Sequence, residues 1–259
     1  MAFSTEPYST GQAGTESAGR MIATALGCIL LAFVGSVVGG VIVALLAATV
    51  RGFAQATLCL AGPCGGIQAS TRSNLAIVAG ALGSATVLFF TARARATTIG
   101  YGDRRYGFGD APVERLPLML ALAGVMATYA IVVAVVYYRI RPDRVSPMLL
   151  ATGWLNVTFL TIAVVIAPVA EELFFRGWLW VGLQRHWSVV PTALLTGLLW
   201  AGIHIDGGFV RPLVLLPVAL ILSMARHFGE SVRAPIALHA LYNIIVLSPP
   251  WHLKWLGLT

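Results

Sequence analysis

The residues of this chain that could do chemistry lie in an otherwise apolar C-terminal half. They are two adjacent carboxylates, a guanidinium, two imidazoles and a carboxamide: Glu171, Glu172, Arg176, His204, His239 and Asn243. A charged side chain at mid-bilayer costs roughly 2.5–3.5 kcal/mol on insertion scales, so such groups persist mainly where they have a function. A carboxylate and an imidazole can activate water, and an imidazole and a carboxamide can stabilise an oxyanion. The default hypothesis is therefore an intramembrane active site.

The composition is that of a membrane protein. Of the 259 residues, 58% are hydrophobic and only 10% are charged, and the mean hydropathy is +0.84. A soluble domain carries about 25% charged residues, so an ordinary water-facing surface cannot be built here. The stretches that lack Asp, Glu, Lys and Arg are four long ones at 21–50, 74–92, 116–138 and 147–170, and three shorter ones at 189–205, 212–225 and 234–250. Because helices satisfy their own backbone groups in lipid, the sequence predicts an all-α polytopic transmembrane bundle with about seven spans.

The chain divides where polar groups enter the apolar segments. Residues 1–20 lack the basic start of a signal peptide, so we expect a disordered N-terminal tail before a retained first helix. Residues 21–146 are expected to be transmembrane scaffold helices. Residues 147–250 hold every candidate chemical residue and form the expected catalytic helical core, followed by a short C-terminal tail at 251–259.

The net charge of +7 comes from 16 Arg and one Lys. The Arg residues occupy short loops between apolar runs, which favours contact with the lipid bilayer and argues against nucleic-acid binding. Their excess over Lys suggests a GC-rich bacterial genome, and hence a multi-pass protein of the bacterial plasma membrane. The Arg-rich segment 93–115 is expected to be cytoplasmic together with the N-terminus, although Arg139, Arg141 and Arg144 would then lie outside.

Two smaller patterns lie in the first half. Gly35 and Gly39 form a small-x-x-x-small pair, for which we expect packing within the monomer rather than a dimer contact. Cys59 and Cys64 share the 51–73 loop, which is expected to be external. Both a disulfide and two free thiols are compatible with that location.

Helical geometry separates the two carboxylates of the acidic pair. Glu172 and Arg176 are i,i+4 neighbours on one helix face and are expected to form an ion pair. Glu171 is expected to point elsewhere and to be free for general acid–base work, because it lies roughly 140° around the axis from Arg176. If the chain turns near Ser188, Glu171 lies 17 residues before the turn and His204 lies 16 after it. The two residues should therefore reach nearly the same height in a helical hairpin.

His239 and Asn243 are also i,i+4 neighbours and share a helix face. An imidazole and a carboxamide placed in this way can donate two hydrogen bonds to one point, as an oxyanion site requires. Each residue alone could instead tie two helices together by a hydrogen bond. Their occurrence with the acidic pair and His204 favours a functional site.

Three ordered motifs resemble those of a protease family. The motifs are Glu171-Glu172-Leu-Phe-Phe-Arg176, Trp200-Ala-Gly-Ile-His204 and His239-Ala-Leu-Tyr-Asn243. Over residues 147–248 the chain resembles the CPBP (CAAX protease and bacteriocin-processing) intramembrane proteases, which include CAAX prenyl protease 2 and Abi-like proteins. Trp200 stands where this family commonly has Phe.

The resemblance implies a peptidase in which the first Glu and the middle His activate water. By this analogy Glu171 is the general base and His204 is its partner. His239 and Asn243 would stabilise the oxyanion, while Glu172 and Arg176 support the site. The implied substrate is a membrane protein or peptide, and the oligomeric state is left open.

Other assignments remain open on the sequence alone. Glu171, His204 and His239 could supply a His₂Glu zinc set, but no His-Glu-x-x-His motif is present, and an arrangement that requires no cofactor is favoured. A non-catalytic membrane scaffold that regulates a partner enzyme would need none of these residues. A proton-coupled transporter would use intramembrane Glu and His, but no inverted repeat is visible.

Overall fold

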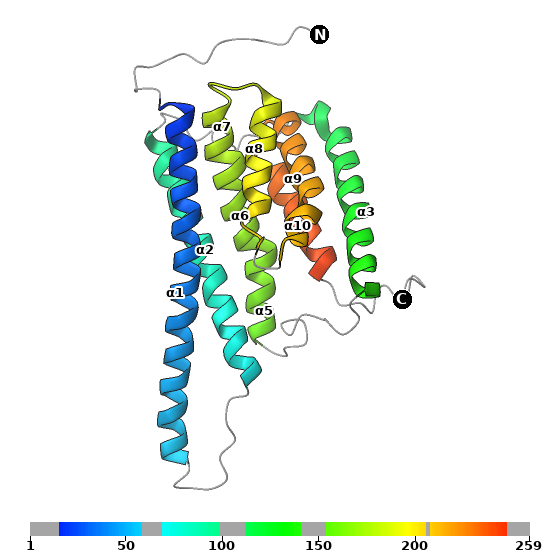
Figure 1. The fold of residues 1–259 in the computed structure, drawn as a ribbon. Helices are drawn as coiled ribbons and strands as arrows, with labels where there is room; N and C mark the ends of the chain where they lie inside the picture. Colours follow the sequence, from blue (N-terminus) through cyan, green and yellow to red (C-terminus); the bar gives the residue numbers. More distant parts are fainter. Residues whose placement is uncertain (1–15, 59–68, 99–111, 141–153, 206–207, 248–259) are drawn as a thin grey trace.

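The computed structural model describes residues 16–58, 69–98, 112–140, 154–205 and 208–247. Every regular element within these ranges is a helix, and the helices form one bundle (Figure 1). In chain order they are α1 (Ala18–Leu58), α2 (Ala69–Thr98), η2 (Val113–Arg115), α3 (Leu116–Ile140), α5 (Trp154–Thr161), η3 (Ile162–Ile166), α6 (Ala167–Glu172), η4 (Leu173–Leu179), α7 (Trp180–Leu183), α8 (Val189–Gly202), α9 (Val210–Gly229) and α10 (Arg233–Leu247). Most of the predicted tails, and both Cys59 and Cys64, lie outside the described residues.

The described part of the chain contains five helices long and apolar enough to cross a membrane and two shorter apolar helices. The long ones cover Ala18–Ile42, Ile77–Arg95, Val113–Tyr137, Val157–Leu183 and Val210–Gly229, and the shorter ones are α8 and α10. The predicted all-α membrane bundle is thus confirmed. One boundary differs from the expectation, because the fourth span extends to Leu183 rather than ending near residue 170. The acidic pair therefore lies within this span instead of at its end.

The long fourth span stays helical through Pro168 because its backbone widens there. Proline has no backbone N–H and its ring crowds the preceding turn, so it breaks a regular α-helix. The preceding segment η3 is a π-helical turn, in which the Ala167 N–H bonds the Ile162 carbonyl five residues back. A second π-helical stretch, η4, follows α6. Such stretches accommodate distortions and are frequent at functional sites.

The two N-terminal helices pack closely through small residues. A Cβ atom on Gly83 would lie 3.2 Å from the Gly35 carbonyl oxygen, and one on Gly80 would lie 2.7 Å from Ser36 Oγ. A Cβ atom on Gly39 would meet the α2 backbone at 3.6 Å. The predicted packing of Gly35 and Gly39 within the monomer is therefore confirmed, with α2 as the partner of α1.

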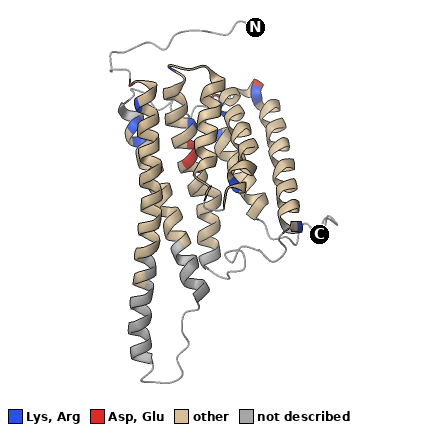
Figure 2. Ribbon diagram, in the orientation of Figure 1, with Lys and Arg blue, Asp and Glu red and all other residues tan. Residues whose placement is uncertain are grey.

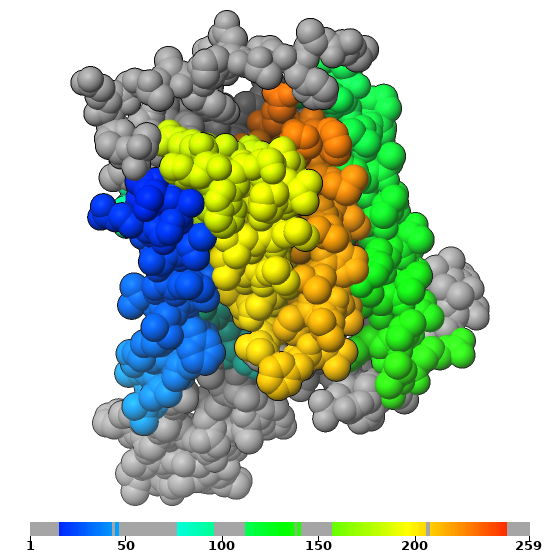
Figure 3. Space-filling view, turned by 45° about the horizontal axis from the view of Figure 1, so that its top comes forward, coloured from blue at the N-terminus to red at the C-terminus, as the bar shows by residue number. Residues whose placement is uncertain are grey.

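The helix that carries the acidic pair lies at the centre of the bundle. α2 packs against α6 and η4 on one side, α8 packs against η4 and α9, and α10 packs against α3, α6 and α9. The space-filling view shows α8, α9 and α3 side by side on one face (Figure 3). All seven residues of η4 are buried. The sequence motif around the acidic pair is consequently enclosed by helices from both halves of the chain.

Charged residues are sparse in the described part of the bundle. Figure 2 shows the acidic pair of α6 well inside the bundle, whereas most other charged residues lie toward helix ends. Glu172 and Arg176 are both 0% exposed. This placement is costly in an apolar environment unless each group has partners nearby.

Candidate active site

The buried ion pair predicted from the i,i+4 spacing is present. Arg176 Nη1 donates to Glu172 Oε1 at 3.0 Å, where α6 passes into η4. The same guanidinium donates through Nη2 to the Ala219 carbonyl of α9 at 3.2 Å. Arg226 of α9 returns a hydrogen bond from its Nε to the Arg176 carbonyl at 2.8 Å. These bonds fix the π-helical stretch against α9.

His239 shares the same carboxylate. Its Nδ1 lies 3.0 Å from Glu172 Oε1, and its side chain is almost completely buried. An ionised carboxylate can only accept, so Nδ1 must carry the proton in this contact. His239 Nε2 is then a lone-pair acceptor in the neutral ring and a second donor in the imidazolium. Glu172 thereby holds Arg176 and His239 in place together.

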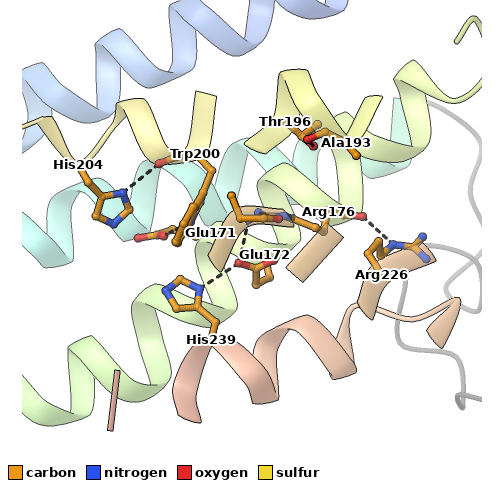
Figure 4. A network of polar contacts seen from close by, with 10 residues as sticks. Glu171, Glu172, Arg176, Ala193, Thr196, Trp200, His204, Arg226 and His239 are labelled. Carbon is orange, nitrogen blue, oxygen red and sulfur yellow. Dashed lines mark hydrogen bonds and ion pairs between the residues drawn. The ribbon is translucent and has the colours of Figure 1, made fainter. Parts of the chain in front are cut away.

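The other carboxylate of the acidic pair has a different partner. Trp200 Nε1 donates to Glu171 Oε2 at 2.7 Å, and Glu171 is only partly buried (Figure 4). The predicted division between a paired and a separate carboxylate is thus observed. The sequence identified Trp200 only as the residue at a position where the resembling family commonly has Phe, and its hydrogen bond to Glu171 was missed. The four-residue spacing before His204 marked the position, but nothing in the pattern indicated the direction of the indole N–H.

His204 lies on the turn that follows α8, where it is partly buried. Its Nδ1 is 2.9 Å from the carbonyl oxygen of Trp200, and its ring centroid is 5.0 Å from that of Trp200. A carbonyl oxygen can only accept, so Nδ1 carries the proton and Nε2 is directed elsewhere. Trp200 also contacts the His239 ring at 5.2 Å between centroids. Glu171, His204 and His239 therefore surround a single indole, as Figure 4 shows.

Asn243 satisfies a backbone group that Pro168 leaves unpaired. In the π-helical pattern of η3, the carbonyl of Ala163 would be bonded by the N–H of the residue at position 168. Pro168 has no N–H, and Asn243 Nδ2 donates to this carbonyl instead at 2.7 Å. The carboxamide keeps a second N–H on Nδ2. The common point of donation predicted for His239 and Asn243 stays a prediction, since each residue already has one protein partner.

Because Asn243 bonds a backbone carbonyl, Asn243→Ala is expected to destabilise the fold in addition to any effect on catalysis. The substitution strands the Ala163 carbonyl and should lower the free energy of unfolding by about 1–3 kcal/mol. Pro168→Ala restores an N–H at position 168, so Asn243→Ala should cost less in that background. A double-mutant cycle of unfolding in mixed detergent micelles measures the difference. Equal costs in both backgrounds would contradict the pairing.

The donor atoms of this site do not form a metal-binding set. Within the described ranges, no group of three or more His, Cys, Asp and Glu side chains is placed to hold a metal ion. The hydrogen bonds of the three candidate zinc ligands engage Glu171 Oε2, His204 Nδ1 and His239 Nδ1 and do not involve Glu171 Oε1 or the two Nε2 atoms. The relative placement of the side chains, and not these hydrogen bonds, is therefore what disfavours a His₂Glu zinc site.

The comparisons with known proteins agree with the resemblance carried by the three motifs. Residues 152–245 match the family model Rce1-like, described as type II CAAX prenyl endopeptidase Rce1-like. This segment runs from the start of the fourth span into α10 and includes all six candidate site residues. Neither the curated proteins nor the solved structures gave a match. Residues 152–245 of this multi-pass membrane protein are thus similar to the Rce1-like type II CAAX prenyl endopeptidases, which is consistent with a CPBP intramembrane protease.

Proposed function

We propose that this protein is an intramembrane endopeptidase that hydrolyses a peptide bond of a membrane-associated protein or peptide in the bacterial plasma membrane. The family match supports intramembrane protease activity in general. The observation that carries the finer proposal is the grouping of Glu171, His204 and His239 around Trp200 inside an apolar bundle. A structural role alone does not account for Glu171 and His204, two half-buried ionisable side chains that both contact Trp200.

The proposed chemistry uses the atoms that the protein leaves unengaged. The Trp200 indole N–H donates to Glu171 Oε2, and the Trp200 carbonyl accepts from His204 Nδ1. Glu171 Oε1 and His204 Nε2 are therefore the remaining acceptor atoms. A water that donates one hydrogen to each acceptor has its own lone pair directed at a substrate carbonyl. Glu171 takes the proton as the C–O bond forms and delivers it to the leaving amine nitrogen as the C–N bond breaks. The sum of these steps is addition of water across the peptide bond.

The oxyanion of the tetrahedral intermediate is assigned to His239 and Asn243. Asn243 is partly exposed and has a second N–H to donate, whereas His239 is 3% exposed. His239 can donate from Nε2 only as the imidazolium, because its Nδ1 proton faces Glu172. With that proton, the charges of Glu171, Glu172, Arg176 and His239 cancel. A neutral set is the arrangement that an apolar interior tolerates best.

Proteolysis is expected to need no metal. Among the residues that the structure describes, no three His, Cys, Asp or Glu side chains are placed to hold a metal ion, which supports this expectation. Incubation of the purified protein with phenanthroline should leave the cleavage rate unchanged. A zinc metalloprotease treated in the same micelles controls for chelation. Loss of activity that added zinc restores would contradict the metal-free assignment.

The substrate class can be tested with a lipid-modified peptide. The family description names CAAX prenyl endopeptidases, so an internally quenched farnesylated CAAX peptide in liposomes is the natural first probe. Cleavage with a single new carboxyl terminus, identified by mass spectrometry, is the expected result. The same peptide without the farnesyl group tests whether membrane association is required. Failure to cleave either peptide or any host membrane protein would overturn the proposed function.

A non-catalytic scaffold is the second candidate, and one observation favours it. The bonds among Glu172, Arg176 and His239, with the Ala219 carbonyl, link α6, η4, α9 and α10. Such a network could serve stability alone. This network does not include Glu171 or His204, so a scaffold role does not explain why two ionisable residues lie beside it. We therefore favour the protease.

A further inference from the structure

Trp200 contacts four of the six candidate site residues, although it was not itself one of them. Its side chain is 1% exposed. Its indole N–H donates to Glu171, its carbonyl accepts from His204, and its ring lies against His204 and two further groups. The ring contacts are with His204 at 5.0 Å, His239 at 5.2 Å and the Arg176 guanidinium carbon at 5.1 Å from the ring centroid.

The indole bond selects one oxygen of the general base. At 2.7 Å it is short, as expected for a donor facing an ionised carboxylate. Holding Oε2 fixes the plane of the Glu171 carboxyl group and leaves Oε1 to take a proton. A half-buried Glu side chain without this bond would sample several rotamers, and displacements of about 1 Å from the reacting geometry can cost roughly 100-fold in rate.

The backbone of the same residue selects one nitrogen of His204. Its carbonyl oxygen receives the Nδ1 proton, which fixes the ring orientation and leaves Nε2 toward the site. The two acceptors proposed to hold the water are therefore both set by one rigid, buried residue. We propose that Trp200 is a positioning residue of the active site, which aligns Glu171 through its indole N–H and His204 through its carbonyl. This inference rests on the proposed function.

The geometry can be tested without any catalytic assay. The chain has seven Trp residues, so protein labelled with ¹⁵N at the indole nitrogens should give seven indole resonances. The signal lost in Trp200→Phe identifies Trp200. In Glu171→Gln this signal should move upfield, because a neutral amide oxygen is a weaker acceptor than a carboxylate. A signal that does not move would overturn the hydrogen bond on which the proposal depends.

Trp178 supplies a matched control for the kinetic test. It is also fully buried, but among the described residues its Nε1 has no hydrogen-bond partner. Trp178→Phe and Trp200→Phe therefore remove a similar amount of buried aromatic surface, and only the second removes a bond to Glu171. Trp200→Phe should lower kcat for the farnesylated peptide by about 10–100-fold with KM nearly unchanged. Trp178→Phe should leave both constants at the wild-type values.

The outcomes separate this inference from the proposed function. Equal effects of the two Phe variants on kcat, or a rise in KM alone for Trp200→Phe, would reduce Trp200 to a packing residue. Wild-type kinetics in Trp200→Phe together with an inactive Glu171→Gln would overturn the positioning role and leave the protease intact. Near-normal cleavage by Glu171→Gln would remove Glu171 as the base and this inference with it, whereas absence of cleavage by the wild type would overturn the proposed function itself.

Discussion

Replacing Glu171 by Gln is expected to abolish proteolysis while the fold is retained. Gln has nearly the same shape, and its amide oxygen can still accept the Trp200 indole N–H. It cannot take a proton from water, so the contribution of a general base, roughly 10²–10⁴-fold, is lost. Initial rates of peptide cleavage in liposomes measure the effect. Circular dichroism and the unfolding midpoint in mixed micelles should match the wild-type values.

Near-normal turnover in Glu171→Gln would remove Glu171 from the role of base. If the variant instead lost its fold, the substitution would be acting through structure. Glu171→Asp distinguishes these cases, because it keeps the acid and withdraws it by one methylene. We expect the Asp variant to fold normally and to retain a small part of the activity.

Replacing Glu172 by Gln is expected to produce the opposite pattern. Glu172 is fully buried and accepts from both Arg176 and His239 through Oε1. Removing its charge strands a buried guanidinium, which typically costs about 3–5 kcal/mol when one partner of a buried pair is lost. The free energy of unfolding in mixed micelles should fall accordingly. Activity at a temperature where the variant is folded should fall less than in Glu171→Gln.

The adjacent carboxylates serve as controls for each other. Glu171→Gln should be inactive and stable, and Glu172→Gln should be unstable and partly active. Adding Arg176→Met to Glu172→Gln removes the stranded charge and should recover part of the lost stability. A Glu172→Gln variant as stable as the wild type, or as inactive as Glu171→Gln, would contradict the division of roles.

Much of this arrangement could be predicted because it depends on helical periodicity. Composition alone indicates a membrane bundle, and the i,i+4 spacing of Glu172 and Arg176 is sufficient to predict their ion pair. The loop near Ser188 likewise fixes the relative heights of Glu171 and His204. These features involve residues close in sequence or related by one short turn, so local geometry determines them.

The contacts that could not be predicted join helices distant in sequence or depend on backbone distortion. The π-helical turn before Pro168 makes the Ala163 carbonyl available to Asn243, and no periodic pattern indicates it. Arg226 was read as one of the loop arginines, yet it bonds the Arg176 carbonyl fifty positions earlier in the chain. Trp200 was recognised as aromatic, but its N–H could be oriented only once α8 was placed beside α6.

The central claim is that Glu171 is the base of a protease acting on a membrane substrate. Quantitative membrane proteomics of the native host carrying either the wild type or Glu171→Gln tests it most directly. The account predicts that an uncleaved membrane protein accumulates only in the variant, and its missing terminal fragment locates the cleaved bond. Identical proteomes, in a host where deleting the whole protein does cause a phenotype, would contradict the protease and favour the scaffold.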